Sequence, residues 1–326
     1  MKINMSHGSG GNASQDLMKN IFAKHFANEI LDKMEDAAVL EVNGKIAFST
    51  DSFVVTPIFF KGGDIGKLAI CGTTNDLLMM GATPKYITVG FIMEEGLEIQ
   101  ELETIVISMK EAAREAGIKI VAGDTKVVEG NGGLYINTSG IGTIKEGVNI
   151  SASNCVDGDV IIISGNLGDH HACILSERMK IENNIKSDCA PLNSIVFALL
   201  DNGIKVKAMR DVTRGGLGTI LNEIADSSNC SIEIIEKSLP VSETVRSFSE
   251  ILGLDPLYMA NEGKMIAIVP GEDAEKALEI MKNIPYSKDA AIIGKVAGGN
   301  RVFMKTNLGG TRIVDILYGE GLPRIC

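Results

Sequence analysis

The chain has 326 residues, of which 45% are hydrophobic, 22% are charged and 5% are aromatic, and it contains no tryptophan. This composition is typical of a folded globular protein, and the net charge of −11 disfavours binding to nucleic acid or to an anionic membrane, because phosphate groups require a basic surface. No apolar stretch reaches the length of a secretory signal or a bilayer span, so we expect a cytoplasmic protein.

Strand and helix patterns alternate through the first half of the chain. Short apolar runs predict strands, and apolar residues spaced by three and four predict helices. In chain order we predict a strand at 45–50, a helix at 65–80, a strand at 86–93, a helix at 99–116 and strands at 118–122 and 134–144. A polar stretch containing glycine follows at 146–159, so we place a domain boundary near residue 150.

The second half shows a new alternation. Predicted strands at 160–164, 206–209, 232–235 and 265–269 alternate with predicted helices at 191–202, 217–227, 243–252 and 273–283, and short strands follow at 291–296, 301–305 and 312–317. Two successive series of strands and helices predict a mixed fold of the α+β and α/β classes with two domains.

Three apolar runs end on an aspartate: Asp51 in IAFSTD, Asp124 in IKIVAGD and Asp211 in VKAMRD. Ligands of α/β proteins collect beyond the carboxyl ends of strands, so the three carboxylates are candidates for one shared site. A single aspartate in this position is more often a turn residue or a helix N-cap. Three of them, each beside Gly or Thr, favour a functional cluster.

A fourth carboxylate, Asp76, falls on the apolar face of the helix predicted at 65–80. A buried, unpaired carboxylate costs several kcal/mol, so Asp76 requires a cation, a proton or hydrogen-bond donors. Mg²⁺ is commonly bound by one or two carboxylates together with nucleotide phosphates. A purely structural hydrogen bond is the alternative.

Two glycine-rich stretches, HGSGG at 7–11 and DVTRGG at 211–216, precede helical patterns and are candidate phosphate-binding loops, because backbone N–H groups at such places bind anions. Neither is a known nucleotide fingerprint, and a plain turn is an equal alternative. Lys126 in GDTK and Glu262 in NEGK are candidates for acid–base work or phosphate binding, with ordinary surface charge as the alternative.

The six cysteines are scattered, and five of them fit small buried side chains. Cys326 differs, because the terminal GLPRIC cannot easily form part of a core. Its own α-carboxylate opposes the thiolate and Arg324 favours it, so we predict a nearly ordinary thiol. His170 and His171, in GNLGDHHAC, are expected to cap a helix rather than to bind a ligand.

These segments together resemble the hydrogenase maturation carbamoyl dehydratase family (HypE), in the AIR synthase-like superfamily, over nearly the whole chain. The resemblance is carried by HGSGG, STDSFVV, CGTTNDLLMMGA, VAGDTKVV, MRDVTRGGLGTILNEIA, NEGK and the terminal PRIC. The chain departs from the family at 168–171, where Gly-Asp-His-His stands for the usual Gly-Asp-His-Gly. We therefore carry no role onto His171.

The resemblance implies a fold and a site. Residues 1–34 would form a glycine-rich segment covering the nucleotide, 35–150 an ATP-binding domain whose sheet forms a β-barrel between the subunits of a homodimer, 151–305 an α/β domain and 306–326 a flexible tail. Mg²⁺ would be held by Asp51, Asp76 and Asp211, and ATP by Gly8, Gly10, Gly11, Asp124, Lys126 and Thr213.

The resemblance also implies a reaction. A partner carbamoyltransferase (HypF) would load a carbamoyl group onto Cys326, the tail would enter the ATP site, and dehydration would give a thiocyanate whose cyanide passes to a HypC–HypD iron scaffold. Glu262 and Lys126 are the candidates for proton handling. The alternatives are a small-molecule ATP-dependent synthase or kinase of the superfamily and a nucleotide-binding scaffold with a docking tail.

Overall fold

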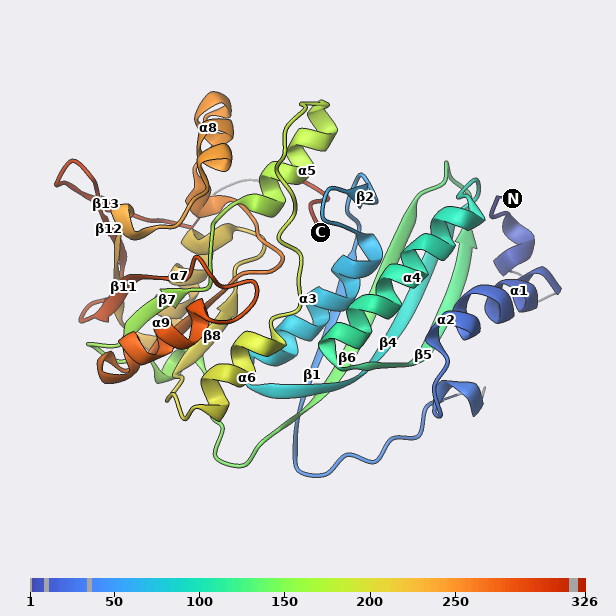
Figure 1. The fold of residues 1–326 in the computed structure, drawn as a ribbon, viewed down its shortest axis with the longest axis horizontal. Coiled ribbons are helices and arrows are strands. Elements are labelled where there is room, and N and C mark those ends of the chain that lie inside the picture. Colours follow the sequence, from blue (N-terminus) through green and yellow to red (C-terminus); the bar gives the residue numbers. More distant parts are fainter. Residues whose placement is uncertain (1, 9–11, 34–36, 317–321) are drawn as a thin grey trace.

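The structure is a computed structural model that describes residues 2–8, 12–33, 37–316 and 322–326. Gly10 and Gly11 therefore lie outside the described residues. Figure 1 shows two sheets side by side, each covered by helices. The C-terminus lies between them, near helix α5 (Asp169–Met179) and the small strand β2 (Phe59–Phe60).

The first sheet has four strands in the order β1-β6-β4-β5. Its elements are β1 (Lys45–Phe53), α3 (Ile65–Met79), β4 (Ala82–Glu94), α4 (Ile99–Ala116), β5 (Lys119–Val128) and β6 (Leu134–Ile144). Strands β4 and β5 are parallel and are joined by α4, whereas β6 is antiparallel to β1 and β4. Helix α3 starts where the Asp64 carboxylate accepts hydrogen bonds from the amides of Gly66 and Lys67, an ordinary N-cap.

Helices α3 and α4 cover one face of this sheet, and the other face is open (Figure 1). Large apolar side chains are exposed along its strands: Ile46 (50% exposed), Phe48 (65%), Ile92 (44%) and Val128 (40%). Helices α1 (Asn12–Leu17) and α2 (Lys24–Phe26) are joined by a helical turn at Met18–Ala23. Phe22 in this turn packs on the sheet, with its ring centroid 4.8 Å from that of Phe91 on β4.

The second sheet has seven strands in the order β13-β12-β9-β11-β7-β10-β8. Its strands are β7 (Val160–Ile163), β8 (Ala208–Asp211), β9 (Ser231–Ile235), β10 (Met265–Val269), β11 (Ala291–Ala297), β12 (Val302–Lys305) and β13 (Thr311–Ile313). Its helices are α5, α6 (Asn193–Asp201), α7 (Gly216–Ser228), α8 (Glu243–Leu252) and α9 (Ala274–Lys282). Two hydrophobic clusters include residues of the central strands. One also contains residues of α7, and the other contains residues of α6 and α9.

The predicted two-domain fold of mixed class is confirmed, with most elements within a few residues of their predicted ends. Helix α5 and the hairpin of β2 with β3 (Gly63–Asp64) were not predicted. In the single chain the four-stranded sheet is open, so the barrel between two subunits remains a prediction.

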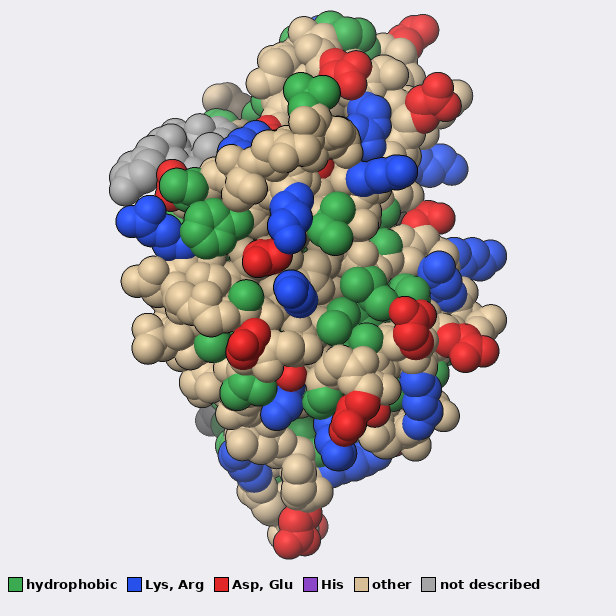
Figure 2. Space-filling model, turned by 90° about the vertical axis from the view of Figure 1, so that its left-hand side faces the viewer, with side chains coloured by type: hydrophobic (Ala, Val, Ile, Leu, Met, Phe, Trp, Pro, Cys, Tyr) green, Lys and Arg blue, Asp and Glu red, His purple; other side chains and the backbone are tan. Residues whose placement is uncertain are grey.

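Over the described ranges, no helix combines the length and apolar character needed to cross a bilayer. Figure 2 shows the end of the molecule that carries the second sheet. Lys and Arg side chains alternate there with Asp and Glu, and apolar side chains lie between them, so this face does not present the one-signed basic surface that a phosphate backbone needs.

Candidate active site

Three of the predicted acids lie on neighbouring elements: Asp51 on β1, Asp76 on α3 and Asp211 at the end of β8. Asp51 Oδ2 accepts a hydrogen bond from Thr73 Oγ1 at 2.8 Å, and Asp76 Oδ2 accepts one from Ser49 Oγ at 2.7 Å. These bonds fix the β1 and α3 carboxylates on the covered face of the sheet.

The acids influence one another strongly. Burial raises the pKa of Asp76 to about 6, and the charge of Asp51 adds to the shift. Burial also raises the pKa of Asp211 to about 7, with a further contribution from Asp76, while Arg210 opposes it. Within the described parts of the chain, no three His, Cys, Asp or Glu side chains form a ready-made metal site. Crowded carboxylates of this kind fit a hard cation that keeps several ligands from water or phosphate, as Mg²⁺ does.

Glu262 lies beside these acids in the second unit. Its side chain is buried, and Oε1 has no hydrogen-bond partner among the described residues. Burial raises its pKa well above the usual range, and nearby Cys189 and Asp211 raise it further. Its amide donates to Asp188 Oδ1 at 3.1 Å. The next residue must be glycine, because a Cβ on Gly263 would lie 1.9 Å from the Asp188 carbonyl oxygen.

The described tail residues, 322–326, are docked between the two sheets near β2 and α5 (Figure 1). The amide of Val54, directly after β1, donates to an oxygen of the Cys326 carboxylate at 2.9 Å, and the amide of Thr56 donates to the Arg324 carbonyl at 3.2 Å. The Ile325 side chain is 3% exposed and belongs to the hydrophobic cluster of the first unit. Arg324 also extends over the Tyr135 ring, 5.6 Å from its centroid.

This docking places the Cys326 thiol among the acids. Burial raises its pKa to about 12, and the charges of Glu262, Asp51 and Asp211 add to the shift, whereas Arg214 opposes it. The prediction of a nearly ordinary thiol is therefore wrong for the docked tail. That prediction considered only the carboxylate of Cys326 and the charge of Arg324. It did not include burial of the thiol or the acids from distant segments of the chain.

His170 is a site residue that sequence reasoning missed. Its Nε2 lies 2.8 Å from the Ile325 carbonyl oxygen and its Nδ1 lies 2.7 Å from Ser187 Oγ. The expected capping role is wrong, because the N-cap of α5 is Gly168 and no side chain caps that end. The available signal was the Gly-Asp-His run between a strand and a helix, but the helix itself was not predicted.

The other predicted ligands lie on β5, in the N-terminal turn beside it and in the loop before α7. Asp124 and Lys126 form an exposed ion pair at 3.4 Å. Gly8 approaches β5 closely, since a Cβ there would lie 2.9 Å from the Val127 nitrogen. The Thr213 carbonyl accepts a hydrogen bond from the Gly216 amide at the start of α7. Because β5 and β1 are opposite edges of the sheet, the structure does not bring Lys126 and Asp51 together within one chain.

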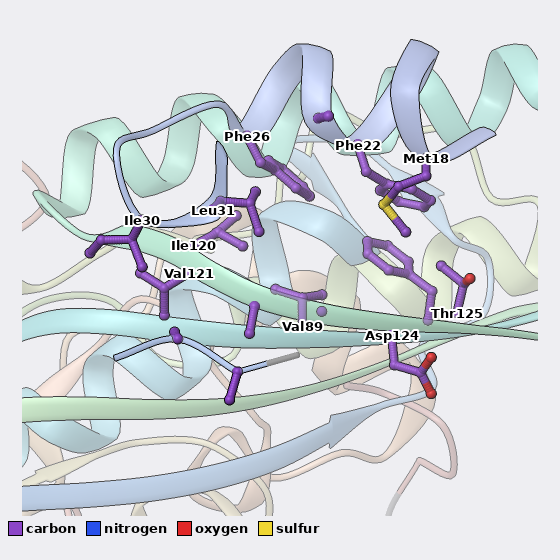
Figure 3. Close-up of a pocket in the computed structure, with 16 residues that line it drawn as sticks. Met18, Phe22, Phe26, Ile30, Leu31, Val89, Ile120, Val121, Asp124 and Thr125 are labelled. Carbon is purple, nitrogen blue, oxygen red and sulfur yellow. The ribbon is translucent and has the colours of Figure 1, made fainter. Parts of the chain in front are cut away.

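A cavity of about 180 Å³ lies between the N-terminal helices and β4–β5. Figure 3 shows its apolar lining, including Phe22, Phe26 and Ile120, with Asp124 and Thr125 at one end. The Asp124 carboxylate points away from the aromatic side chains. The cavity therefore adjoins the GDTK segment rather than the docked tail.

Comparisons with known proteins agree with this geometry. The AIR synthase related protein N-terminal domain matches residues 34–144, and the corresponding C-terminal domain matches residues 156–307. Carbamoyl dehydratase HypE of Azotobacter vinelandii is 48% identical over 331 residues, covering 99% of this chain and 97% of the relative. The chain belongs to the carbamoyl dehydratase HypE family.

Other HypE proteins extend the comparison. Carbamoyl dehydratase HypE of Escherichia coli is 45% identical and is covered over 99% of both chains. A solved structure of hydrogenase maturation protein HypE in complex with ATP superposes with a TM-score of 0.96 at 47% identity, over 99% of both chains. A chain of a HypE–HypF complex matches with a TM-score of 0.82 at 50% identity, over 92% of this chain and 99% of that chain.

Proposed function

We propose that the chain dehydrates a carbamoyl group on the sulfur of Cys326 to a thiocyanate, at the expense of ATP. The activity class is that of its family, carbamoyl dehydration in hydrogenase maturation. The observation that carries the residue assignment is the docked tail, whose thiol lies within the electrostatic reach of Glu262, Asp51 and Asp211.

In the proposed reaction the carbamoyl oxygen leaves as phosphate and the nitrogen loses both protons, so S–C(O)NH₂ and ATP give S–C≡N, ADP and phosphate. ATP would supply the phosphoryl group that makes this oxygen a leaving group, and a bound Mg²⁺ would supply charge neutralisation for that phosphoryl group. Asp51, Asp76 and Asp211 would hold the cation, since burial and neighbouring negative charge already raise the pKa values of Asp76 and Asp211, and a cation would relieve that cost. This use of the acids fits a HypE relative solved with ATP.

Glu262 is the proposed proton acceptor. Burial raises the pKa of Glu262 well above the usual carboxylate range, which makes its carboxylate a stronger base than an exposed one. Its unpartnered Oε1 leaves one oxygen free to face the loaded tail. The burial of Glu262 keeps water away from the carbamoyl group once its oxygen is phosphorylated, and so limits hydrolysis of that group.

We propose that two copies pair through the open face of the first sheet. Its exposed apolar residues Ile46, Phe48 and Ile92 are the kind of patch that a partner covers. The register pairs Lys126 on β5 with Ile92 on β4, so the Lys126 side chain lies on this same open face, with β6 and β4 between β5 and β1. Lys126 would then act in the partner's site rather than in its own.

A mixing experiment tests this assignment of Lys126. Mixed dimers of Lys126→Met and Cys326→Ala chains contain one site with both groups if Lys126 acts across the interface, so activity should return although each variant alone is inactive. If Lys126 acts within its own chain, the mixture stays inactive, because no site then has both residues.

The proposed partners are a HypF carbamoyltransferase, which loads Cys326, and a HypC–HypD scaffold, which accepts the cyanide. The solved HypE–HypF complex, matched at 50% identity, supports the first of these. The scaffold follows from the family's place in hydrogenase maturation.

Mass analysis of the C-terminal peptide tests the function. After incubation with carbamoyl phosphate, ATP, Mg²⁺ and the transferase, we expect the peptide to gain a carbamoyl group and then to lose one water. Cys326→Ala should abolish both changes, and Cys230→Ala, at a cysteine remote from the tail, should change neither. Turnover that survives Cys326→Ala would instead indicate a small-molecule synthase or kinase. An absence of turnover in the wild type as well as in the variants would indicate a docking scaffold.

A further inference from the structure

We propose that His170 and Arg178 of α5 are positioning residues that form a receptor for the C-terminal tail, and that their hydrogen bonds set the fraction of molecules in which Cys326 is docked. This deepens the proposed function by identifying what holds the loaded sulfur in the site. It can nevertheless be tested without ATP or a carbamoyl donor.

The receptor binds the tail through its backbone. The peptide carbonyls of residues 323 to 325 each accept a hydrogen bond, from Arg178 for residues 323 and 324 and from His170 for Ile325, and an oxygen of the Cys326 carboxylate accepts one from the Val54 amide. Since carbonyl groups are common to all residues, these bonds fix position without selecting sequence. Selection falls to the Ile325 side chain, which is 3% exposed in its apolar site.

The contact of His170 determines its tautomer. A carbonyl oxygen only accepts, so Nε2 must carry the hydrogen toward Ile325. Nδ1 then accepts from Ser187 Oγ, which itself accepts from the Cys189 amide at 3.1 Å. The Phe60 ring contacts the imidazole edge-on at a centroid distance of 5.5 Å. Ser187 and Phe60 therefore orient the imidazole through contacts that do not involve the tail.

Arg178 joins the tail to the first unit. Its Nε donates to the Thr56 carbonyl at 2.6 Å, and its two terminal nitrogens donate to the carbonyls of Pro323, at 2.6 Å, and Arg324. One planar guanidinium thus bonds the β1–β2 connection and the tail together.

The same bonds must break before a transferase can reach the sulfur. Weakening the receptor should therefore speed loading of Cys326 and slow its dehydration. General destabilisation of the fold would slow both steps, so opposite effects on the two half-reactions identify a positioning role.

The test is the alkylation rate of Cys326 in the full-length protein, followed by mass spectrometry. The docked thiol is shielded and resists ionisation, so iodoacetamide should react mainly with released tails. His170→Asn keeps an amide near the Ser187 position and loses the donor to Ile325, whereas the longer His170→Gln retains a donor in reach of Ile325. Losing one net hydrogen bond should raise the rate about fivefold in His170→Asn, and His170→Gln should react nearly as slowly as the wild type.

Cys173 is the internal control, because it is buried on the same helix. It should remain unreacted in both variants, which shows that α5 is intact. If His170→Asn unfolds the helix, Arg178→Gln, which changes a half-buried side chain, carries the same expectation. Equal rates in the wild type and in a folded His170→Asn or Arg178→Gln variant would overturn the proposal.

Discussion

The Val54 amide donates a hydrogen bond to a carboxylate oxygen of Cys326 at 2.9 Å, so Cys326 is bonded to the residue that directly follows the strand carrying Asp51. This hydrogen bond holds the residue that carries the Cys326 thiol next to β1, the strand that carries Asp51 of the candidate magnesium site. The proposed chemistry therefore depends on contact between two segments that lie far apart in the sequence.

Replacing Glu262 by glutamine should stop thiocyanate formation and leave ATP binding intact. General-base groups commonly contribute about 10²–10⁴-fold to a rate, so we expect a loss of at least about 100-fold in the dehydration of preloaded protein. The measurement is single-turnover mass analysis. Glu272→Gln, at an exposed ion pair with Lys205, is the matched control and should behave as wild type. Unchanged turnover in Glu262→Gln would remove this residue from the mechanism.

Asp76→Asn should stabilise the metal-free protein and abolish its response to Mg²⁺ and ATP. The folded pKa of Asp76, about 6, lies above its unfolded value near 4, so the folded wild type loses stability as pH rises from about 4 to 6. At pH 8 without Mg²⁺, Asp76→Asn should therefore melt a few degrees higher. Adding Mg²⁺ and ATP should raise the melting temperature of the wild type only.

Asp169 offers a pH test away from the acid cluster. Burial raises its pKa to about 7, and the charge of Asp188 adds to the shift. Ionisation of Asp169 therefore lowers the free energy of unfolding as pH rises from near 4 to about 7, by up to about 1.4 kcal/mol per pH unit, and the loss is complete above pH 7. Asp169→Asn should thus gain stability over the wild type between pH 4 and 7. Stability curves of Asp169→Asn and the wild type that run parallel between pH 4 and 7 would contradict the assignment.

Phe48→Lys should prevent pairing of two copies. Phe48 is 65% exposed on the open face, and a charge buried in an interface costs several kcal/mol. Light scattering should report a dimer for the wild type and a monomer for the variant. Leu308→Lys, in the exposed turn between β12 and β13, removes a fully exposed apolar side chain and should leave the dimer intact.

Most of the secondary structure was predictable because it follows local apolar periodicity. Helix α4 occupies the predicted 99–116, and β6 occupies the predicted 134–144. Helix α5 was missed because its inward residues include His170 and His171, which the hydrophobic pattern does not count as core. Its mean apolar signal is weak although its side chains are buried.

The site was only partly predictable. Asp76 was inferred from its helix face, and the structure places it beside Asp51. The tail receptor was not inferred, because it consists of backbone carbonyls and side chains such as Arg178, whose spacing along the sequence carries no pattern. Likewise, the separation of Lys126 from Asp51 depends on strand order, which strand-end motifs do not encode.

The last turn of α3 has a consequence for how such a site operates. Leu78 and Met79 belong to the hydrophobic cluster of the second unit, although their helix lies on the first sheet. A hinge between the sheets would have to pull these side chains out of a packed interior. Asp76 on the first unit and Asp211 on the second are therefore held at a fixed separation. Delivery of the reacting group then depends on movement of the C-terminal tail rather than on closure of the two domains.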